Sequence, residues 1–527
     1  MKLLKYLFVS SVLLVATSCG NNWLDLDPST SVDTETSIKI LSDVEFTLNG
    51  IYSTMQSSDA YSGRLVYYGD VTGDDMQAVS STKRVANYYR FNFTKDNGPT
   101  SHWSYLYSII QNCNLILMNI DKLKIDEEDA AYRDDLKGEA LALRGLALFD
   151  LTRIFGYPYT KNNGASLGVP IIEGLSTIDS KPARNTVAQC YEKIIDDLTK
   201  STKLLSGKFN KGKINKWGAM VLLSRVYLYK NDNTNAFNTA KEAIEGAEKQ
   251  GYALWTNEEY PTAWGNDASA SNPGEVLFEI VNLTTDSPGK ESMGYLNSKD
   301  GYDDMCITCS FYQFLKEDPN DVRLKLLSFD KKYYAYVFKY QPQQNENIED
   351  ANIPLIRLSE AYLIAAEAAV KLNDNDAAVE FLDPIVRRAN PDKTVQGEKI
   401  TLERVLNERR KELVAEGHRM YDAVRNGLTI ERVNVTDKNL SKTKHDTKYM
   451  KDINWAVLGT GVIANEMAVA LKKNGKNIYA VGNRTYEKAV AFGEKYGIGK
   501  VYADYNEMFT DPEVDVIYIT TPHNTHK

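Results

Sequence analysis

The chain lacks the positive charge and the cysteine pattern that identify several classes of protein. Its 527 residues carry a net charge of −9, whereas non-specific nucleic-acid binding needs a basic surface that displaces counterions. Only five cysteines are present. The one close pair, Cys306 and Cys309, has no second pair and no nearby histidine, so a disulfide or two free thiols is favoured over a redox or metal motif. The sequence therefore predicts no nucleic-acid partner and no metal site.

A catalytic arrangement is also missing. His418 lies in a charged segment, but no serine or cysteine nucleophile motif accompanies it. The charged residues around it place opposite signs three and four positions apart on an expected helix, which indicates structural ion pairs rather than catalysis. These residues are Glu408, Arg409, Arg410, Glu412, Glu416 and Arg419. This pattern favours a binding protein over an enzyme.

The start of the chain has no apolar run long enough to span a bilayer comfortably, because the stretch covers only residues 7–16. Two lysines precede it and small residues follow, which is the layout of a secretory signal. Cys19 comes directly after the small residues, as in a bacterial lipobox, although leucine is usual where Ala16 stands. We expect a lipoprotein signal peptide over 1–18, a lipidated Cys19 and an extended tether over 19–36. The alternative is an ordinary signal peptide with an incidental cysteine.

From residue 37 onward the dominant pattern is helical. Apolar residues recur at steps of three and four in 138–156 and again in 354–372. The segments 216–245 and 355–388 each read as a helix, a polar turn and a second helix, which is the unit of tetratricopeptide-like repeats. Further helices are expected over 103–123, 186–205 and 402–425.

Long irregular stretches that are rich in aromatic residues separate these helices, from Ser58 to Phe93 and over much of Gly251 to Met305. The chain contains 33 tyrosines, and tyrosine combines a flat apolar ring with a hydroxyl, which suits sugar binding. Long loops in a compact domain are unusual unless they carry function. The sequence therefore predicts a mainly α scaffold that displays loops.

Five motifs follow one another along the chain: "WSYLYSIIQNCNLIL", "ALRGLALFDLTRIFGYPY", "RNTVAQCYEKIIDDLTKSTKLL", "IRLSEAYLIAAEAAVKL" and "ERRKELVAEGHRMYDAVRNG". In this order they resemble the SusD/RagB family of outer-membrane nutrient-binding lipoproteins. The resemblance implies a nutrient-binding domain over 37–430 that captures oligosaccharide or another nutrient and requires no cofactor. It also implies a lipid anchor in the outer membrane at the cell surface, and a SusC-like TonB-dependent transporter as partner.

In this family, aromatic rings of the early and middle loops stack on sugar rings while polar side chains hold hydroxyls. Transferred by region, the resemblance implies glycan contacts at Arg84, Tyr88, Tyr89, Trp103, Tyr260, Trp264, Tyr295 and Tyr302.

Two family features are lacking. No acidic residues follow Cys19 in "CGNNW", and the family's proline-rich ending is replaced by a polar linker, 431–449, and a different segment.

That segment, 450–527, has the pattern strand (454–458), glycine turn, helix (to about 473) and second strand (477–481). The turn is G-x-G-x-x-A, which lets a pyrophosphate approach a helix N-terminus. Together with the later stretch "YNEMFTDPEVDVIYITTPHNTH", this segment resembles the N-terminus of the Gfo/Idh/MocA oxidoreductases. Arg484 stands where an acidic residue would select NAD, so NADP is expected. The cofactor residues implied are Gly459, Gly461, Ala464, Asn483 and Arg484.

This Rossmann fragment supplies the alternative function, an NADP-dependent oxidoreductase. The segment carries only the first part of the nucleotide-binding sheet, without the family's catalytic lysine motif and substrate domain. Met450 reads as the start of a separate oxidoreductase. We therefore expect a junction close to Met450, made by gene fusion or by a sequence-assembly error.

Overall fold

The computed structural model describes residues 37–94, 98–177, 179–210, 212–265, 271–330, 334–343, 347–430, 454–473, 476, 478–514 and 516–521. The expected signal peptide, tether, lipidated Cys19 and polar linker lie outside these residues.

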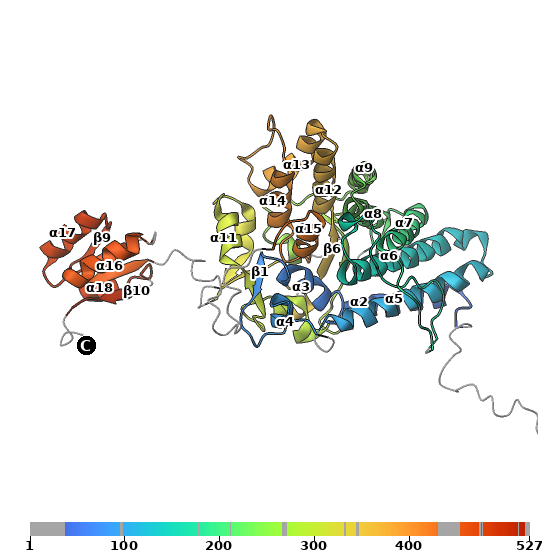
Figure 1. Cartoon of the computed structure of the whole chain (residues 1–527), viewed down its shortest axis with the longest axis horizontal. Helices are drawn as coiled ribbons and strands as arrows, with labels where there is room; N and C mark the ends of the chain where they lie inside the picture. Colours follow the sequence, from blue (N-terminus) through green and yellow to red (C-terminus); the bar gives the residue numbers. More distant parts are fainter. Residues whose placement is uncertain are drawn as a thin grey trace, which may run out of the picture.

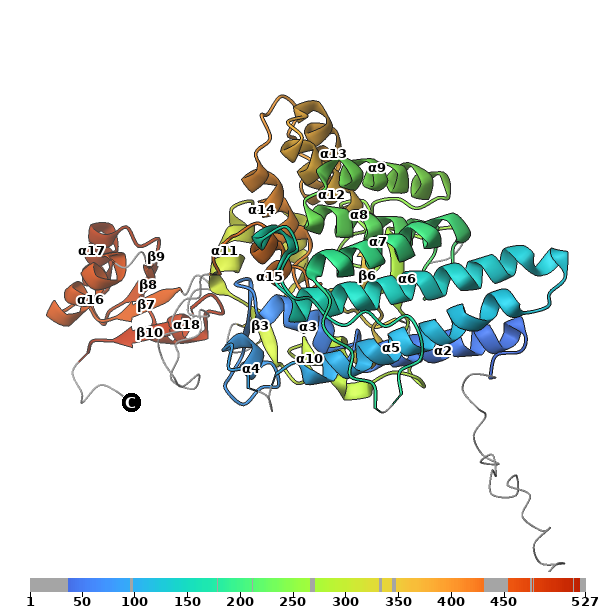
Figure 2. The ribbon, with the colours of Figure 1, turned by 45° about the vertical axis from the view of Figure 1, so that its right-hand side comes forward.

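A row of packed helices forms the scaffold of residues 37–430. Each helix from α5 to α9 packs on the next, and α12 packs on both α9 and α13 (Figures 1 and 2). The row contains α2 (Leu41–Gln56), α5 (Thr100–Asn119), α6 (Ala130–Phe155), α7 (Val187–Leu204), α8 (Lys216–Lys230), α9 (Asn233–Lys249), α12 (Leu358–Lys371) and α13 (Asn375–Ala389). The predicted helical scaffold is therefore confirmed.

Both predicted helix–turn–helix pairs are present, and the same two residue types make their turns. Asn231 and Asn373 adopt the left-handed conformation, with φ of 64° and 61°, which asparagine tolerates better than most residues. Each is followed by an aspartate that caps the next helix. The side chain of Asp232 accepts from the backbone N–H of Asn235, and that of Asp374 accepts from Ala377.

Two predicted helices are shorter than expected. Residues 353–357 form strand β6 (Ile353–Arg357), which pairs antiparallel with β2 (Val276–Ile280), so α12 begins only at Leu358. The helix expected over 402–425 is divided into α14 (Leu402–Glu412) and α15 (Arg419–Arg425). Gly417 between them has a φ of 78° and donates its N–H to Asp70 at 2.8 Å. In both places a contact distant in sequence overrides the local helical pattern.

The segment 58–93 is not a displayed loop, and that expectation is wrong. It contains α3 (Arg64–Val71), β1 (Met76–Ala78) and α4 (Ala86–Tyr89), and most of its side chains are buried. The middle of the chain adds α10 (Met293–Leu296), β3 (Met305–Ile307), α11 (Cys309–Lys316), β4 (Leu327–Phe329) and β5 (Ala335–Val337). Strand β1 pairs with β3, and β4 pairs with β5, both antiparallel.

Residues 454–521 form a small α/β unit with its own hydrophobic clusters. Its four strands are parallel in the order β10-β7-β8-β9, as expected of a Rossmann fragment. The elements are β7 (Trp455–Leu458), α16 (Val462–Lys473), β8 (Ile478–Gly482), α17 (Tyr486–Tyr496), β9 (Lys500–Tyr502), α18 (Tyr505–Thr510) and β10 (Val516–Ile519).

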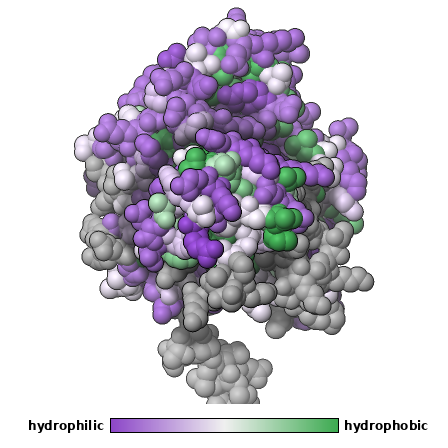
Figure 3. Space-filling view, turned by 90° about the vertical axis from the view of Figure 1, so that its left-hand side faces the viewer, coloured by the Kyte–Doolittle hydropathy of each residue, from purple (hydrophilic) through white to green (hydrophobic). Residues whose placement is uncertain are grey.

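Cys306 and Cys309 are buried free thiols, as are Cys113 and Cys190. Within the described ranges, no helix combines the length and hydrophobicity needed to cross a bilayer. The face in Figure 3 is mostly hydrophilic, and its hydrophobic side chains lie in small separate groups, as is usual for a surface that faces water.

Candidate functional site

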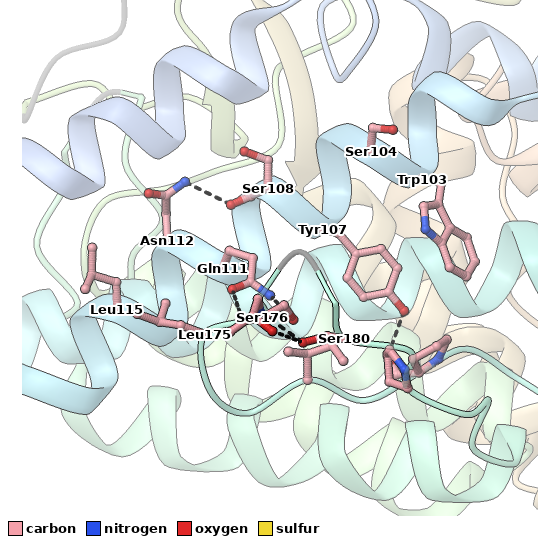
Figure 4. Close-up of a pocket in the computed structure, with 14 residues that line it drawn as sticks. Trp103, Ser104, Tyr107, Ser108, Gln111, Asn112, Leu115, Leu175, Ser176 and Ser180 are labelled. Atoms are coloured by element: carbon pink, nitrogen blue, oxygen red, sulfur yellow. Dashed lines mark hydrogen bonds between the residues drawn. The ribbon is translucent and has the colours of Figure 1, made fainter. Parts of the chain in front are cut away.

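An open groove lies between α5 and the segment 170–182 that follows the α6 helix (Figure 4). Its volume is about 840 Å³, within the range of about 300–1,000 Å³ typical of ligand sites. The lining residues are Trp103, Ser104, Tyr107, Ser108, Gln111, Asn112, Leu115, Pro170, Ile172, Leu175, Ser176, Thr177, Ser180 and Pro182. The helix supplies one wall and the segment supplies the other.

Two aromatic rings form one end of the groove. Trp103 and Tyr107 lie one helical turn apart on α5, with ring centroids 4.9 Å apart and an interplanar angle of 52°. Behind them, Phe155 meets the Trp103 ring edge to face at 5.0 Å. The hydroxyl of Tyr107 donates to the carbonyl of Pro170 at 2.7 Å. These contacts fix both rings, and Trp103 stays half-buried at the groove wall.

Amides and hydroxyls line the rest of the groove. The side chain of Gln111 donates to Ser176 Oγ at 2.8 Å and accepts from the Ser176 backbone N–H at 3.0 Å. Deeper in the fold, Asn114 donates to the carbonyls of Ile172 and Gly174 at 2.8 and 3.0 Å. Arg144 donates to the Asn114 oxygen at 2.8 Å. A buried polar chain therefore holds the 170–182 segment against α5.

The groove is uncharged. None of the described residues that line it is aspartate, glutamate, histidine, lysine or arginine. Its hydroxyls and amides can exchange hydrogen bonds with a neutral ligand. They offer no carboxylate pair and no imidazole, the groups that most often serve as a general acid or base.

A second surface brings together three of the expected glycan residues. The Arg84 guanidinium lies 4.1 Å from the centroid of the Tyr302 ring, and Tyr295 meets Tyr302 edge to face at 4.9 Å. Arg84 is also paired with Glu291 at 3.0 Å and with Asp304 at 3.3 Å. Burial raises the pKa of Asp304, and Arg84 opposes that rise. One face of the Tyr302 ring is thus already covered by a cation that two carboxylates hold.

Four other expected glycan residues lie in the interior. Tyr88 and Tyr89 are each 8% exposed, Tyr260 is 0% exposed and Trp264 is 5% exposed. The Arg388 guanidinium lies 4.2 Å from the Tyr260 ring, and that of Arg357 lies 4.7 Å from Trp264. Protein atoms cover most of each ring, so these residues take part in packing. Trp264 also lines a cavity of about 250 Å³ together with Trp255 and Glu259.

Of the eight expected residues, only Trp103 lines the groove. Sequence reasoning missed Tyr107 and Gln111, although their spacing of four from Trp103 and from each other places all three on one face of the helix. It also missed the 170–182 segment, because no local pattern shows that this segment folds back onto α5.

The charged motif of residues 408–419 forms ion pairs, as predicted, but mostly with distant elements rather than along its own helix. Glu412 lies 3.0 Å from Arg357 and 2.7 Å from Arg388, while Glu416 lies 2.7 Å from Arg357. His418 is buried beside these groups, and both burial and the nearby arginines lower its pKa well below the usual range. The motif therefore ties β6, α13 and α14 together.

The glycine turn of residues 459–464 connects β7 to α16. Gly459 has a φ of 103°, and a Cβ there would lie 2.5 Å from Thr520 Oγ1. Gly461 faces open space, and α16 begins at Val462. Ala464 is buried, while the Asn483 amide donates to the carbonyl of Thr485 at 3.1 Å. The turn would hold a pyrophosphate at the helix N-terminus, and the bound cofactor would supply a hydride acceptor.

Three family models match successive parts of the chain. Residues 22–228 match a family described as starch-binding and associating with the outer membrane. Residues 327–458 match the SusD family. Residues 453–527 match an oxidoreductase family with an NAD-binding Rossmann fold.

Solved structures and a curated relative agree with this division. One Bacteroides vulgatus protein, described as a candidate sugar-binding protein, is 78% identical, with 79% of this chain and 93% of that chain covered and a TM-score of 0.76. A SusD superfamily protein from the same organism is 39% identical, with 77% and 93% covered and a TM-score of 0.72. The tail is 35% identical over 78 residues to mouse trans-1,2-dihydrobenzene-1,2-diol dehydrogenase, which is 14% of this chain and 23% of the relative.

Proposed function

Because the chain belongs to the SusD superfamily, we propose that it captures oligosaccharides in the groove between α5 and residues 170–182. The observation that carries this proposal is the combination of two fixed aromatic rings with an uncharged wall of amides and hydroxyls. Aromatic faces stack on the apolar face of a pyranose ring. Amides and hydroxyls both donate and accept, as sugar hydroxyls require.

The role is binding and not catalysis. The groove is large enough for several sugar rings, and its wall offers neutral hydrogen-bonding groups rather than an acid–base pair. Glycoside hydrolysis would ordinarily need two carboxyl groups across the scissile bond. The described lining contains none.

Binding to a panel of soluble polysaccharides tests this role. We expect at least one glycan to retard the full chain in affinity electrophoresis, and Trp103→Ala to weaken binding about tenfold, which corresponds to about 1.4 kcal/mol. Tyr302→Ala is the matched control, because it removes a ring of the Arg84 surface, and we expect less than a twofold change. No retention by any glycan would contradict the proposal, and so would turnover of a sugar in a hydride-transfer assay with NADP.

We propose further that the protein is anchored in the outer membrane by a lipid on Cys19 and passes its ligand to a SusC-like TonB-dependent transporter. The lipobox-like start and the matched outer-membrane family support this placement. The glycine turn of the tail is not needed for the role.

Cell fractionation tests the anchor. The parent protein is expected in the membrane fraction, and Cys19→Ala is expected in the periplasmic or culture fraction, because a signal cleaved without lipidation leaves no acyl chain. Metabolic labelling with a fatty acid provides the independent readout. Equal membrane association of both proteins would contradict the lipid anchor.

A further inference from the structure

The parallel sheet of residues 454–521 has two edges that differ in their protection. Strand β9 forms one edge and β10 forms the other (Figure 2). In β9, Lys500 is ion-paired with Asp511 at 2.7 Å, and a lysine on an edge strand commonly prevents pairing with another chain. Residues 516–521, which contain β10, read "VIYITT" and carry no charge. The β10 edge therefore lacks the protection that the β9 edge has.

The backbone of β10 also has hydrogen-bonding groups on its outer side. Among the described residues, β10 pairs with β7 alone. The N–H groups of Val516 and Thr520 donate toward β7, at 3.4 and 2.8 Å. Alternate residues of a parallel strand face the same neighbour, so the N–H and C=O groups of Ile517 and Ile519 point away from β7. Two donors and two acceptors are thus placed to pair with a further strand.

The side chains of β10 are only partly covered, although parallel sheets usually bury both of their faces. Val516, Ile517 and Tyr518 are half-buried, and Ile519 is 43% exposed. Ile517 and Ile519 lie on one face of the strand, and Tyr518 lies on the opposite face. The edge thus combines outward backbone groups with exposed apolar side chains, which is the combination that favours pairing with another chain.

We propose that the β10 edges of two copies of this chain pair antiparallel about a two-fold axis and join their four-stranded sheets into one. With the axis at Tyr518, Ile517 of each copy lies opposite Ile519 of the other, and the two Tyr518 residues face each other. The outward backbone groups of Ile517 and Ile519 then bond to each other, and cross-strand pairs of this apolar kind stabilise a sheet. An axis at Ile517 would instead set the acidic Asp515 opposite Ile519.

A second copy suits this edge because the edge is complementary to itself. A two-fold contact uses the same surface patch on both partners, and an uncharged strand meets no repulsion from its own copy. The paired strands are only four residues long, so the contact is smaller than a standard interface. We therefore expect a dimer whose population depends on protein concentration. The contact involves the tail alone and does not depend on the glycan groove.

Sedimentation of the full chain tests the contact. The protein is used as the non-acylated Cys19→Ala form, so that neither a lipid nor this thiol contributes. We expect the average mass to rise toward twice that of one chain between about 2 and about 200 µM. Ile519→Lys places a charge on the edge and is expected to weaken association by about tenfold or more. Val469→Lys is the matched control, because Val469 is 57% exposed on α16, and it should associate like the parent.

Cross-linking provides a readout that does not depend on whether Ile519→Lys folds. Residues that face each other in this pairing lie close enough for a disulfide, so Tyr518→Cys is expected to form a covalent dimer under mild oxidation. Tyr486→Cys, at a tyrosine that is 45% exposed on α17, should not. A parent that stays monomeric throughout, an Ile519→Lys variant that associates like the parent, or equal cross-linking at both positions would each overturn the proposal.

Discussion

Glu412→Gln is expected to lower the free energy of unfolding by about 3–5 kcal/mol, the usual cost of removing one partner from a buried ion pair. Glu412 is fully buried, and its carboxylate faces three guanidinium groups, those of Arg357 at 3.0 Å, Arg388 at 2.7 Å and Arg323 at 3.5 Å. A neutral amide of the same shape leaves those cations in the interior without their shared counter-charge.

Urea unfolding of the parent and the variant, followed by tryptophan fluorescence, measures this effect. Lys200→Ala is the matched control, because the Lys200–Asp196 pair is also charged, but its side chains are 59% and 46% exposed. We expect the control to change stability by no more than about 0.5 kcal/mol. A loss below about 1 kcal/mol for Glu412→Gln would show that the network does not hold β6, α13 and α14 together.

The second large effect is a steep loss of stability in acid. Burial acts to raise the pKa values of Glu367, Glu408 and Asp422, but adjacent arginines outweigh it and lower each value to about 2. Unfolded carboxyl groups titrate near pH 4. The folded state therefore binds protons less readily than the unfolded state, and the stabilisation is fully present above about pH 5 and is lost as the pH falls toward 2.

With three such groups, the stability should fall by up to about 4 kcal/mol per pH unit in the lower part of that window. Glu139 has the opposite sign, because burial raises its pKa to about 7, so its contribution is lost as the pH rises through 7. We expect a stability maximum near pH 5. Thermal melts between pH 3 and pH 8 measure the profile, and a melting temperature that stays constant from pH 5 to pH 3 would contradict this assignment.

The helical scaffold could be predicted from the sequence, because periodicity and capping residues are local signals. The Asn–Asp turns at 231–232 and 373–374 are an example, since each pair ends one helix and starts the next. Strand β6 could not be predicted in this way, because its partner β2 lies far away in the chain and its own residues continue an apolar pattern that fits a helix. The break at Gly417 likewise depends on Asp70.

The same distinction explains the candidate site. Trp103 could be predicted as a site residue because its motif places an aromatic residue on an early helix. The opposite wall of the groove could not be predicted, because the hydrogen bonds that bring Ser176 to Gln111 join residues 65 positions apart. Tyr260 and Trp264 were expected at the surface because aromatic loop residues suit ligand binding. Aromatic rings also pack well against buried arginines. Tyr260 and Trp264 pack in this way in the present fold.

A crystal structure of the chain with an oligosaccharide from the binding panel tests the central claim most directly. The account predicts a sugar ring in van der Waals contact with Trp103 and hydroxyls bonded to the Gln111 and Ser176 wall of the groove. Sugar bound at Tyr302 and Arg84, with the groove empty, would contradict it.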